Sequence, residues 1–205
     1  MKKFELTNEF ITNRFGTKLF RIRALVEFGD VEAGELGGYV EKESNLGHDD
    51  NAWVYDNAWV YGNAQVSGNA RVYGNARVYG NARVCGNALV CGNAWVCGNA
   101  WVYGNAQVYG NAQVSGDARV CGNGDYAYAH GFGSVNRTTT FFRLKDGGVG
   151  VRCGCFYGTL AQFRDKIRET HGETKKAQEY LMLADLMELR FEEDENEVGN
   201  RKYVE

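Results

Sequence analysis

The chain contains no proline among its 205 residues. Proline lacks a backbone N–H donor, so its absence suits a chain made mostly of paired strands. No run of about 18 apolar residues occurs, so no transmembrane helix and no membrane partner are expected. The polar segment after Met1 also lacks the apolar centre of a signal peptide. We therefore expect a cytoplasmic protein.

An excess of positive charge is also missing. Lys and Arg number 23 against 26 Asp and Glu, which gives a formal net charge of −3. This balance provides no global field for nucleic acid, so nucleic acid is not an expected partner.

Residues 51–122 repeat one six-residue phrase, Asn-Ala-x-Val-x-Gly, twelve times without a change of register. Ala and Val hold their places in all twelve copies; Asp117 replaces one Asn and Asp56 replaces one Gly. Alternate side chains of a strand point to opposite faces, so Ala and Val share one face and the variable residues share the other. The Gly-Asn step favours a turn. Each hexad therefore predicts a short strand and a corner, and three hexads make an 18-residue coil of a triangular solenoid.

The flanks predict a cap at one end and an α+β piece at the other. Residues 1–36 form an N-terminal β cap, with a turn at 13–16 before a strand-like run at 19–26. Residues 37–48 look like two degenerate hexads with Gly38, Val40, Ser44 and Leu46 in the Ala and Val slots, and Asp49-Asp50 shift the phase by two. The β-helix spans 37–122. Residues 123–205 supply a hairpin (138–145 and 149–156), helices starting at Thr159 and covering about 175–191, and a polar end at 192–205.

The repeat resembles the hexapeptide-repeat left-handed parallel β-helix family, as in Val54-Tyr55-Asp56-Asn57-Ala58. The resemblance implies a left-handed coil and a preference for trimers. It also implies acyltransferases, γ-type carbonic anhydrases and non-catalytic scaffolds as relatives. The segments Leu36-Gly37-Gly38-Tyr39-Val40-Glu41 and Cys153-Gly154-Cys155-Phe156 resemble hexapeptide-repeat proteins encoded by phages and prophages, which implies the cytosol of a bacterial host.

Residues for catalysis are scarce. The histidines are His48, His130 and His171, and none lies in the repeat. Three histidine ligands for a zinc site are therefore not supplied. Surface or capping roles are favoured for all three, with His130 the best catalytic candidate of an acyltransferase. No catalytic residue, metal or cofactor is predicted.

The six cysteines favour thiols over disulfides, because four of them share one slot of the hexad. Cys153 and Cys155 alternate with Val149 and Val151, so a buried strand face is preferred to a metal pair.

The variable positions carry the candidate binding residues. Stacking by 18 residues gives three outward faces. The first face shows Trp53, Arg71, Leu89 and Gln107; the second shows Trp59, Arg77, Trp95 and Gln113; the third shows Gln65, Arg83, Trp101 and Arg119. Trp, Tyr and Arg are enriched at interface hot spots, and Arg77 is one coil from two tryptophans, within range of cation–π contact. The predicted binding residues are Trp53, Trp59, Arg71, Arg77, Arg83, Trp95, Trp101 and Arg119.

Two functions remain open. In the first, the chain is a non-enzymatic binding and assembly module. It forms a homo-oligomer, with a trimer favoured, and binds a host protein such as a defence component. Alternatively, it binds a nucleotide-like ligand by stacking on Trp and pairing phosphate with Arg. In the second, it is an acyltransferase acting on a small amine or hydroxyl acceptor. The unbroken register leaves no room for a catalytic loop and favours the first.

Overall fold

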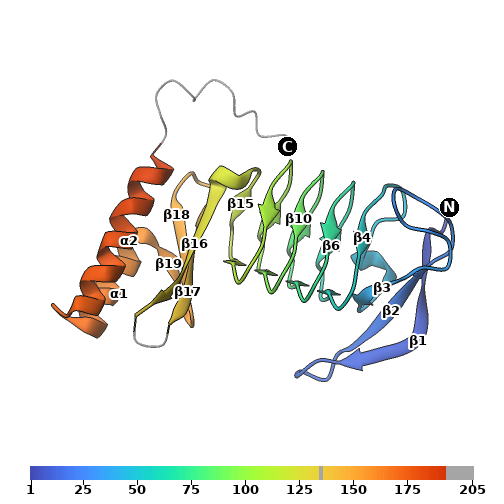
Figure 1. Cartoon of the computed structure of the whole chain (residues 1–205), viewed down its shortest axis with the longest axis horizontal. Coiled ribbons are helices and arrows are strands. Elements are labelled where there is room, and N and C mark those ends of the chain that lie inside the picture. The colour runs from blue at the N-terminus through green and yellow to red at the C-terminus, as the bar shows by residue number, and fades with distance from the viewer. Residues whose placement is uncertain (134–135, 193–205) are drawn as a thin grey trace.

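A solenoid of short strands forms the long axis of the molecule (Figure 1). The computed structural model describes residues 1–133 and 136–192. An N-terminal hairpin lies at one end, and an antiparallel sheet with two helices lies at the other. This mainly β architecture confirms the expected fold class. Most of the polar end, residues 193–205, lies outside the described residues.

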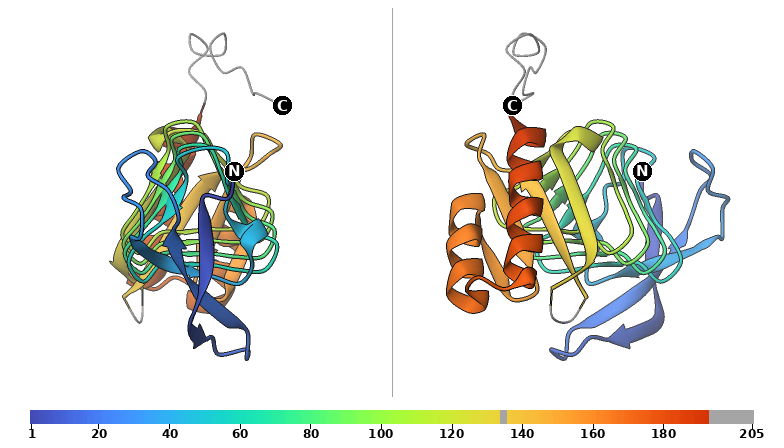
Figure 2. Two further views of the ribbon diagram at one scale, coloured as in Figure 1. Left: turned by 90° about the vertical axis from the view of Figure 1, so that its right-hand side faces the viewer. Right: turned by 60° about the vertical axis from the view of Figure 1, so that its left-hand side comes forward.

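Each hexad forms one two-residue strand, which pairs in parallel with the strand three hexads away. Trp59 lies opposite Arg77, and Arg77 lies opposite Trp95, which confirms the 18-residue coil. Viewed along the axis, the coils enclose a triangle (Figure 2). The three solenoid sheets have the orders β13-β10-β7-β4, β15-β12-β9-β6 and β5-β8-β11-β14. The solenoid strands are β4 (Trp53–Val54), β5 (Trp59–Val60), β6 (Gln65–Val66), β7 (Arg71–Val72), β8 (Arg77–Val78), β9 (Arg83–Val84), β10 (Leu89–Val90), β11 (Trp95–Val96), β12 (Trp101–Val102), β13 (Gln107–Val108), β14 (Gln113–Val114) and β15 (Arg119–Val120).

The constant apolar positions fill the interior. Every Ala and every Val of the twelve hexads is 0% exposed. Burying a Val side chain contributes about 1.5–3 kcal/mol, and its β-branched shape suits a strand. The narrow interior is therefore filled by one small and one branched side chain per hexad.

The corners need glycine for two reasons. The ten repeat glycines from Gly62 to Gly116 have φ between +63° and +73°, and Asp56 takes the same conformation at φ +51°. A Cβ added at Gly86 would also lie 3.0 Å from the Gly104 nitrogen of the next coil. Asparagines beside these corners form ladders between coils, as where Asn63 Nδ2 donates to Asn81 Oδ1 at 3.2 Å. One ladder ends on Asp117, which accepts from Asn99 Nδ2.

The N-terminal segment continues one solenoid sheet. It contains β1 (Phe4–Thr12), β2 (Lys18–Ala24), β3 (Leu36–Val40) and the 3₁₀ turn η1 (Glu43–Asn45). Val40 pairs with Val60, and Leu46 bridges to Val66. The degenerate hexads therefore place Val40 and Leu46 opposite repeat valines, as predicted. The expected Ala-type position of Ser44 is wrong, because Ser44 is exposed in the 3₁₀ turn and Asn45 is buried instead.

Hydrogen bonds join each coil to the next. The N–H of Trp53 in the first coil donates to the carbonyl of Ala70 in the second, and this pattern continues along the solenoid. The first coil leaves carbonyls on its outer side, and these carbonyls need donors. Lys3 Nζ donates to Ala52 O at 2.9 Å, and Asn45 Nδ2 donates to the carbonyls of Gly62 and Ala64. Burial lowers the pKa of Lys3 to about 8, although the carboxylates of Asp50 and Asp49 oppose the shift.

The last coil presents N–H groups and carbonyls that need partners, and the Tyr126 hydroxyl donates to the Gln107 carbonyl at 2.6 Å. Asn123 Oδ1 accepts from the N–H of Gln107, and Thr140 Oγ1 accepts from that of Gln113, both at 2.9 Å. Asp125 Oδ2 accepts from the N–H groups of residues 121 and 122. The buried Asp125 carboxylate also lies 3.5 Å from Arg143 Nε.

The C-terminal part is a four-stranded antiparallel sheet covered by two helices. The expected helices are confirmed, and the first begins at the predicted Thr159 cap, whose Oγ1 accepts from Gln162 N. The single strand expected at 149–156 is wrong: the chain reverses at Gly154, where φ is +60°, so Cys155 lies outside a strand and is exposed. The elements are η2 (Asn123–Asp125), β16 (Tyr126–Phe132), β17 (Arg137–Arg143), β18 (Val149–Cys153), β19 (Phe156–Thr159), α1 (Leu160–His171) and α2 (Lys175–Phe191).

A second apolar core joins this sheet to its helices. Phe141 and Val151 of the sheet pack against Phe163 of α1 and Tyr180 of α2. Within residues 1–133 and 136–192, no helix is long and apolar enough to span a membrane. The cysteines of these ranges form no disulfide.

The corner geometry predicts the effect of replacing a repeat glycine. Gly86→Ala forces an L side chain into positive φ, at about 1–2 kcal/mol, and crowds the next coil. Gly147→Ala is the control, because Gly147 has φ +85° but no atom within 4 Å of an added Cβ. In urea unfolding, Gly86→Ala should lower the free energy of unfolding by roughly 2–4 kcal/mol, and the control should lower it by about 1–2 kcal/mol. Equal losses would contradict a role for close coil stacking.

Candidate binding groove on the second solenoid face

The strand register places the predicted binding residues in the three columns expected. Trp53 pairs with Arg71 on the first face, Trp59 and Trp95 flank Arg77 on the second, and Arg83 and Arg119 flank Trp101 on the third. The three faces differ in which other segments of the chain pack against them.

The prediction that Trp53 is an exposed binding residue is wrong. Trp53 is 0% exposed and packs edge-on against Phe28 at 5.3 Å and Phe4 at 6.2 Å between ring centroids. The N-terminal segment folds over the start of the first face. Arg71 of this face also forms an ion pair with Asp30 of that segment at 3.1 Å.

On the third face, the two arginines lie over the same tryptophan. The guanidinium carbons of Arg83 and Arg119 lie 5.0 and 4.5 Å from the Trp101 ring centroid. Arg119 Nη1 also donates to the carbonyls of Asn99 and Ala118. This arrangement stabilises the sheet surface by itself.

The second face carries two parallel stacks of side chains. Arg77 lies between two tryptophans, with its guanidinium carbon 4.3 Å from the Trp59 centroid and 5.5 Å from the Trp95 centroid. Beside it, Tyr61 and Tyr79 stack at 5.1 Å with an interplanar angle of 6°. The rings are therefore stacked along the coil axis.

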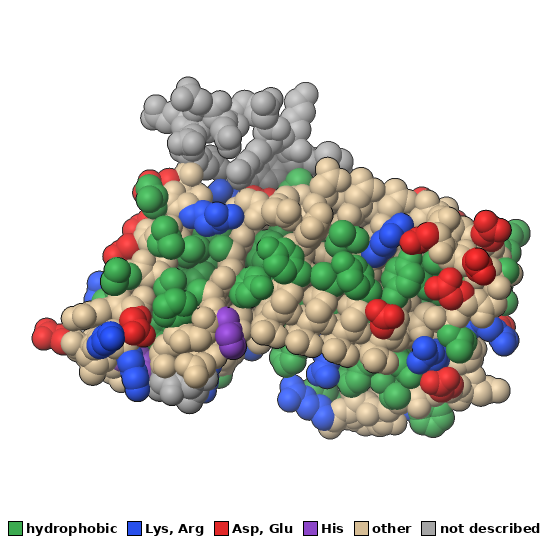
Figure 3. All heavy atoms as spheres, in the orientation of Figure 1, with side chains coloured by type: hydrophobic (Ala, Val, Ile, Leu, Met, Phe, Trp, Pro, Cys, Tyr) green, Lys and Arg blue, Asp and Glu red, His purple; other side chains and the backbone are tan. Residues whose placement is uncertain are grey.

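The turn of the N-terminal hairpin closes this face into a groove of about 230 Å³. We call it the aromatic–arginine groove. The hairpin projects from the side of the triangle that carries this sheet (Figure 2), and Figure 3 shows a notch between the hairpin and the C-terminal part. The groove is lined by Asn13, Arg14, Phe15, Trp59, Tyr61, Arg77, Tyr79 and Trp95.

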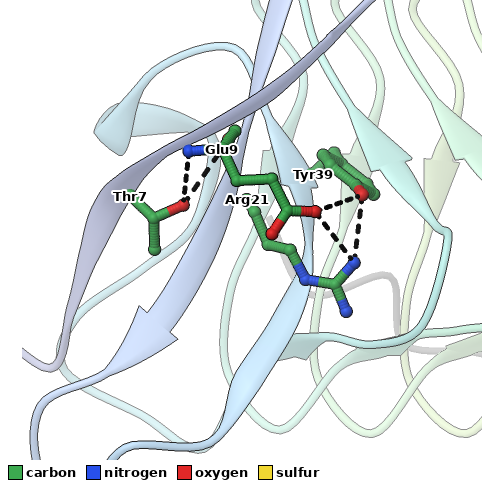
Figure 4. A network of polar contacts seen from close by, with 4 residues as sticks. All are labelled: Thr7, Glu9, Arg21 and Tyr39. Atoms are coloured by element: carbon green, nitrogen blue, oxygen red, sulfur yellow. Dashed lines mark hydrogen bonds and ion pairs between the residues drawn. The ribbon is translucent and has the colours of Figure 1, made fainter.

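A polar network holds the hairpin on the column that contains Trp59. Arg21 Nη1 donates to the Tyr39 hydroxyl at 3.0 Å, and that hydroxyl donates to Glu9 Oε1 at 3.1 Å (Figure 4). Tyr39 is paired with Trp59 in the sheet. Thr7 Oγ1 accepts from the N–H of Glu9 on the same strand. The hairpin is therefore tied to the floor of the groove.

Two arginines, Arg14 and Arg77, line the groove beside the aromatic floor. Burial raises the pKa of Tyr61, and the positive charges of Arg77 and Arg14 oppose that shift. Burial likewise raises the pKa of Tyr79 and Cys97, and there Arg152 of β18 opposes it. The C-terminal sheet therefore brings a third guanidinium near the floor. None of the three arginines forms an ion pair within residues 1–133 and 136–192.

One wall of the groove contains a buried donor. Asn13 is 7% exposed, and its Oδ1 accepts from the N–H groups of Phe15 and Thr17. Its Nδ2 has no hydrogen-bond partner in the described part of the chain. Sequence reasoning found the turn at 13–16 but not its place beside the groove, and it missed Arg152 altogether.

The histidines lie apart from one another. His48 stacks on Phe4 and accepts from the N–H of Lys3, so it belongs to the N-terminal cap. His130 lies on β16 beside Thr138 Oγ1 at 3.0 Å, and His171 stacks on Tyr180. No group of three metal-ligating side chains occurs in the described ranges.

Comparison with known proteins concerns the repeat alone. Residues 52–68, 64–80, 70–86, 76–92, 82–98 and 94–110 match the family described as YdcK beta solenoid repeat. No curated protein matches the chain. The repeat is therefore similar to a β-solenoid family over residues 52–110, and the hairpin turn and Arg152 lie outside the matched segments.

Proposed function

We propose that this chain is a non-enzymatic binding and assembly module whose recognition surface is the aromatic–arginine groove. The observation that carries the proposal is the pair of arginines, Arg14 and Arg77, that line the groove beside stacked aromatic side chains and have no carboxylate partner among the described residues. Charges of this kind favour an anionic partner, and Trp, Tyr and Arg are the residues enriched at hot spots. The hairpin turn confines the site to a small part of the face.

The proposal also includes a family assignment. We infer that the solenoid is a left-handed hexapeptide-type coil, that a phage or prophage encodes the protein, and that the protein acts in the bacterial cytosol. A host protein such as a defence component is the macromolecular partner we propose. No observation at His130 favours the acyltransferase alternative.

We also propose that copies of the chain associate, with a trimer favoured. The surface that supports this lies on α2, where Met182, Leu186 and Leu189 are 71%, 54% and 68% exposed. Their spacing places them on one side of the helix, and exposed apolar patches commonly mark contacts. The sequence analysis assigned assembly to the solenoid faces instead.

Mass photometry tests assembly. The wild type should show a species of about three chains, and Leu186→Lys with Leu189→Lys should reduce it to one chain, because charges at an apolar contact are desolvated without partners. Lys166→Gln, on α1, is the control and should keep the wild-type mass. A monomer for the wild type would contradict the assembly proposal.

Capture from a bacterial lysate, followed by mass spectrometry of bound protein and small molecules, tests recognition. Trp95→Gln is a suitable variant because the repeat already accepts Gln at this slot in Gln113. The matched control is Tyr109→Ser, which removes an exposed aromatic from the first face and uses a residue found in that slot at Ser67.

The wild type and the control should retain the same species, and Trp95→Gln should retain at least about tenfold less, as expected for loss of a hot spot. Equal retention by all three proteins would remove the groove from the proposal.

A further inference from the structure

The charge and shape of the aromatic–arginine groove narrow the class of ligand it accepts. We propose that the groove binds a nucleoside phosphate, with phosphoryl oxygens on Arg14 and Arg77 and the base against Phe15. This inference rests on the proposed function and adds the chemistry of the ligand.

The size of the site favours a small ligand. Its volume of about 230 Å³ is below the usual range of pockets for drug-sized molecules. The hairpin turn walls one end of the groove. A protein partner reaches into such a space only with a side chain or a short loop, whereas a small ligand can lie inside it.

The donors that face this space suit phosphate. Arginine guanidinium groups bind phosphate oxygens in a bidentate, charge-assisted way. Arg14 and Arg77 form no ion pair within the described residues, so neither charge is neutralised by the chain itself. The residues lining the groove include no Asp or Glu. Asn13 Nδ2 adds a buried donor that has no hydrogen-bond partner in the part of the chain that the structure describes.

The place of the base follows from how the rings are arranged. Because Trp59, Arg77 and Trp95 stack on one another, the faces of the indoles are already used by the guanidinium. Phe15 differs, because it is 72% exposed and, among the described residues, only the Arg14 guanidinium lies over its ring, at 4.8 Å. The other side of the Phe15 ring is the stacking surface left for a base. Stacking of a base on an aromatic side chain contributes about 1–3 kcal/mol.

Isothermal titration calorimetry with the full chain tests the inference, using AMP, adenosine, inorganic phosphate and a short oligodeoxyadenylate as probes. AMP should bind the wild type more tightly than adenosine or phosphate. Arg77→Gln, a change that the repeat tolerates at this slot, should weaken AMP about 10- to 100-fold, and Phe15→Ala about tenfold. Arg168→Gln in α1 is the charge-matched control and should leave AMP binding unchanged.

The possible outcomes distinguish a free nucleotide from a nucleic-acid strand and from phosphate alone. An oligonucleotide that binds more tightly than AMP, and that loses affinity in both variants, supports the same nucleotide chemistry with a nucleic-acid strand as its source. Phosphate that binds as well as AMP overturns the role of Phe15. No binding of AMP or oligonucleotide up to about 1 mM overturns the inference. If a lysate protein is still captured through Trp95 in that case, the proposed function stands and only the nucleotide is wrong.

Discussion

The hydrogen bonding between coils is the constraint on which the structure depends. Each coil pairs its backbone with the next coil, as where the N–H of Trp53 donates to the carbonyl of Ala70. A stack of this kind leaves unpaired backbone groups at both ends, and such groups need partners when they are buried. The chain supplies these partners from its two caps: Lys3, Glu41 and Asn45 at the N-terminal end, and Asn123, Asp125, Tyr126 and Thr140 at the other.

The two caps also shape the site. The N-terminal cap extends into the hairpin whose turn lies beside Trp59 and Trp95, and the C-terminal sheet that supplies Thr140 also carries Arg152. The constant residues of the hexad form the core and the corners. Only the variable residues and the caps are therefore left to contact a partner. This is why the second face, lying between both caps, differs from the third face, which has the same kinds of residues.

The periodicity of the sequence predicted the features that follow from strand geometry alone. The 18-residue coil, the partners of Arg77 and the buried Ala and Val follow from alternation and from the unbroken register. The burial of Trp53 does not, because register tells which way a side chain points and not which segment covers it. Arg14, Phe15 and Arg152 were missed for the same reason: they reach the groove through the tertiary arrangement of flanks that have no repeat.

The central claim, that opposite caps satisfy the two ends of the coil stack, is tested most directly by hydrogen exchange of an Asp125→Ala variant. In a solenoid each coil contacts only its neighbours, so loss of one cap should act first on the adjacent coil. We predict that amides of residues 105–122 lose protection by about 1–3 kcal/mol, the cost of leaving buried groups without partners. Amides of residues 51–68 should keep theirs. Unchanged protection at 105–122, or equal loss at both ends, would contradict the account.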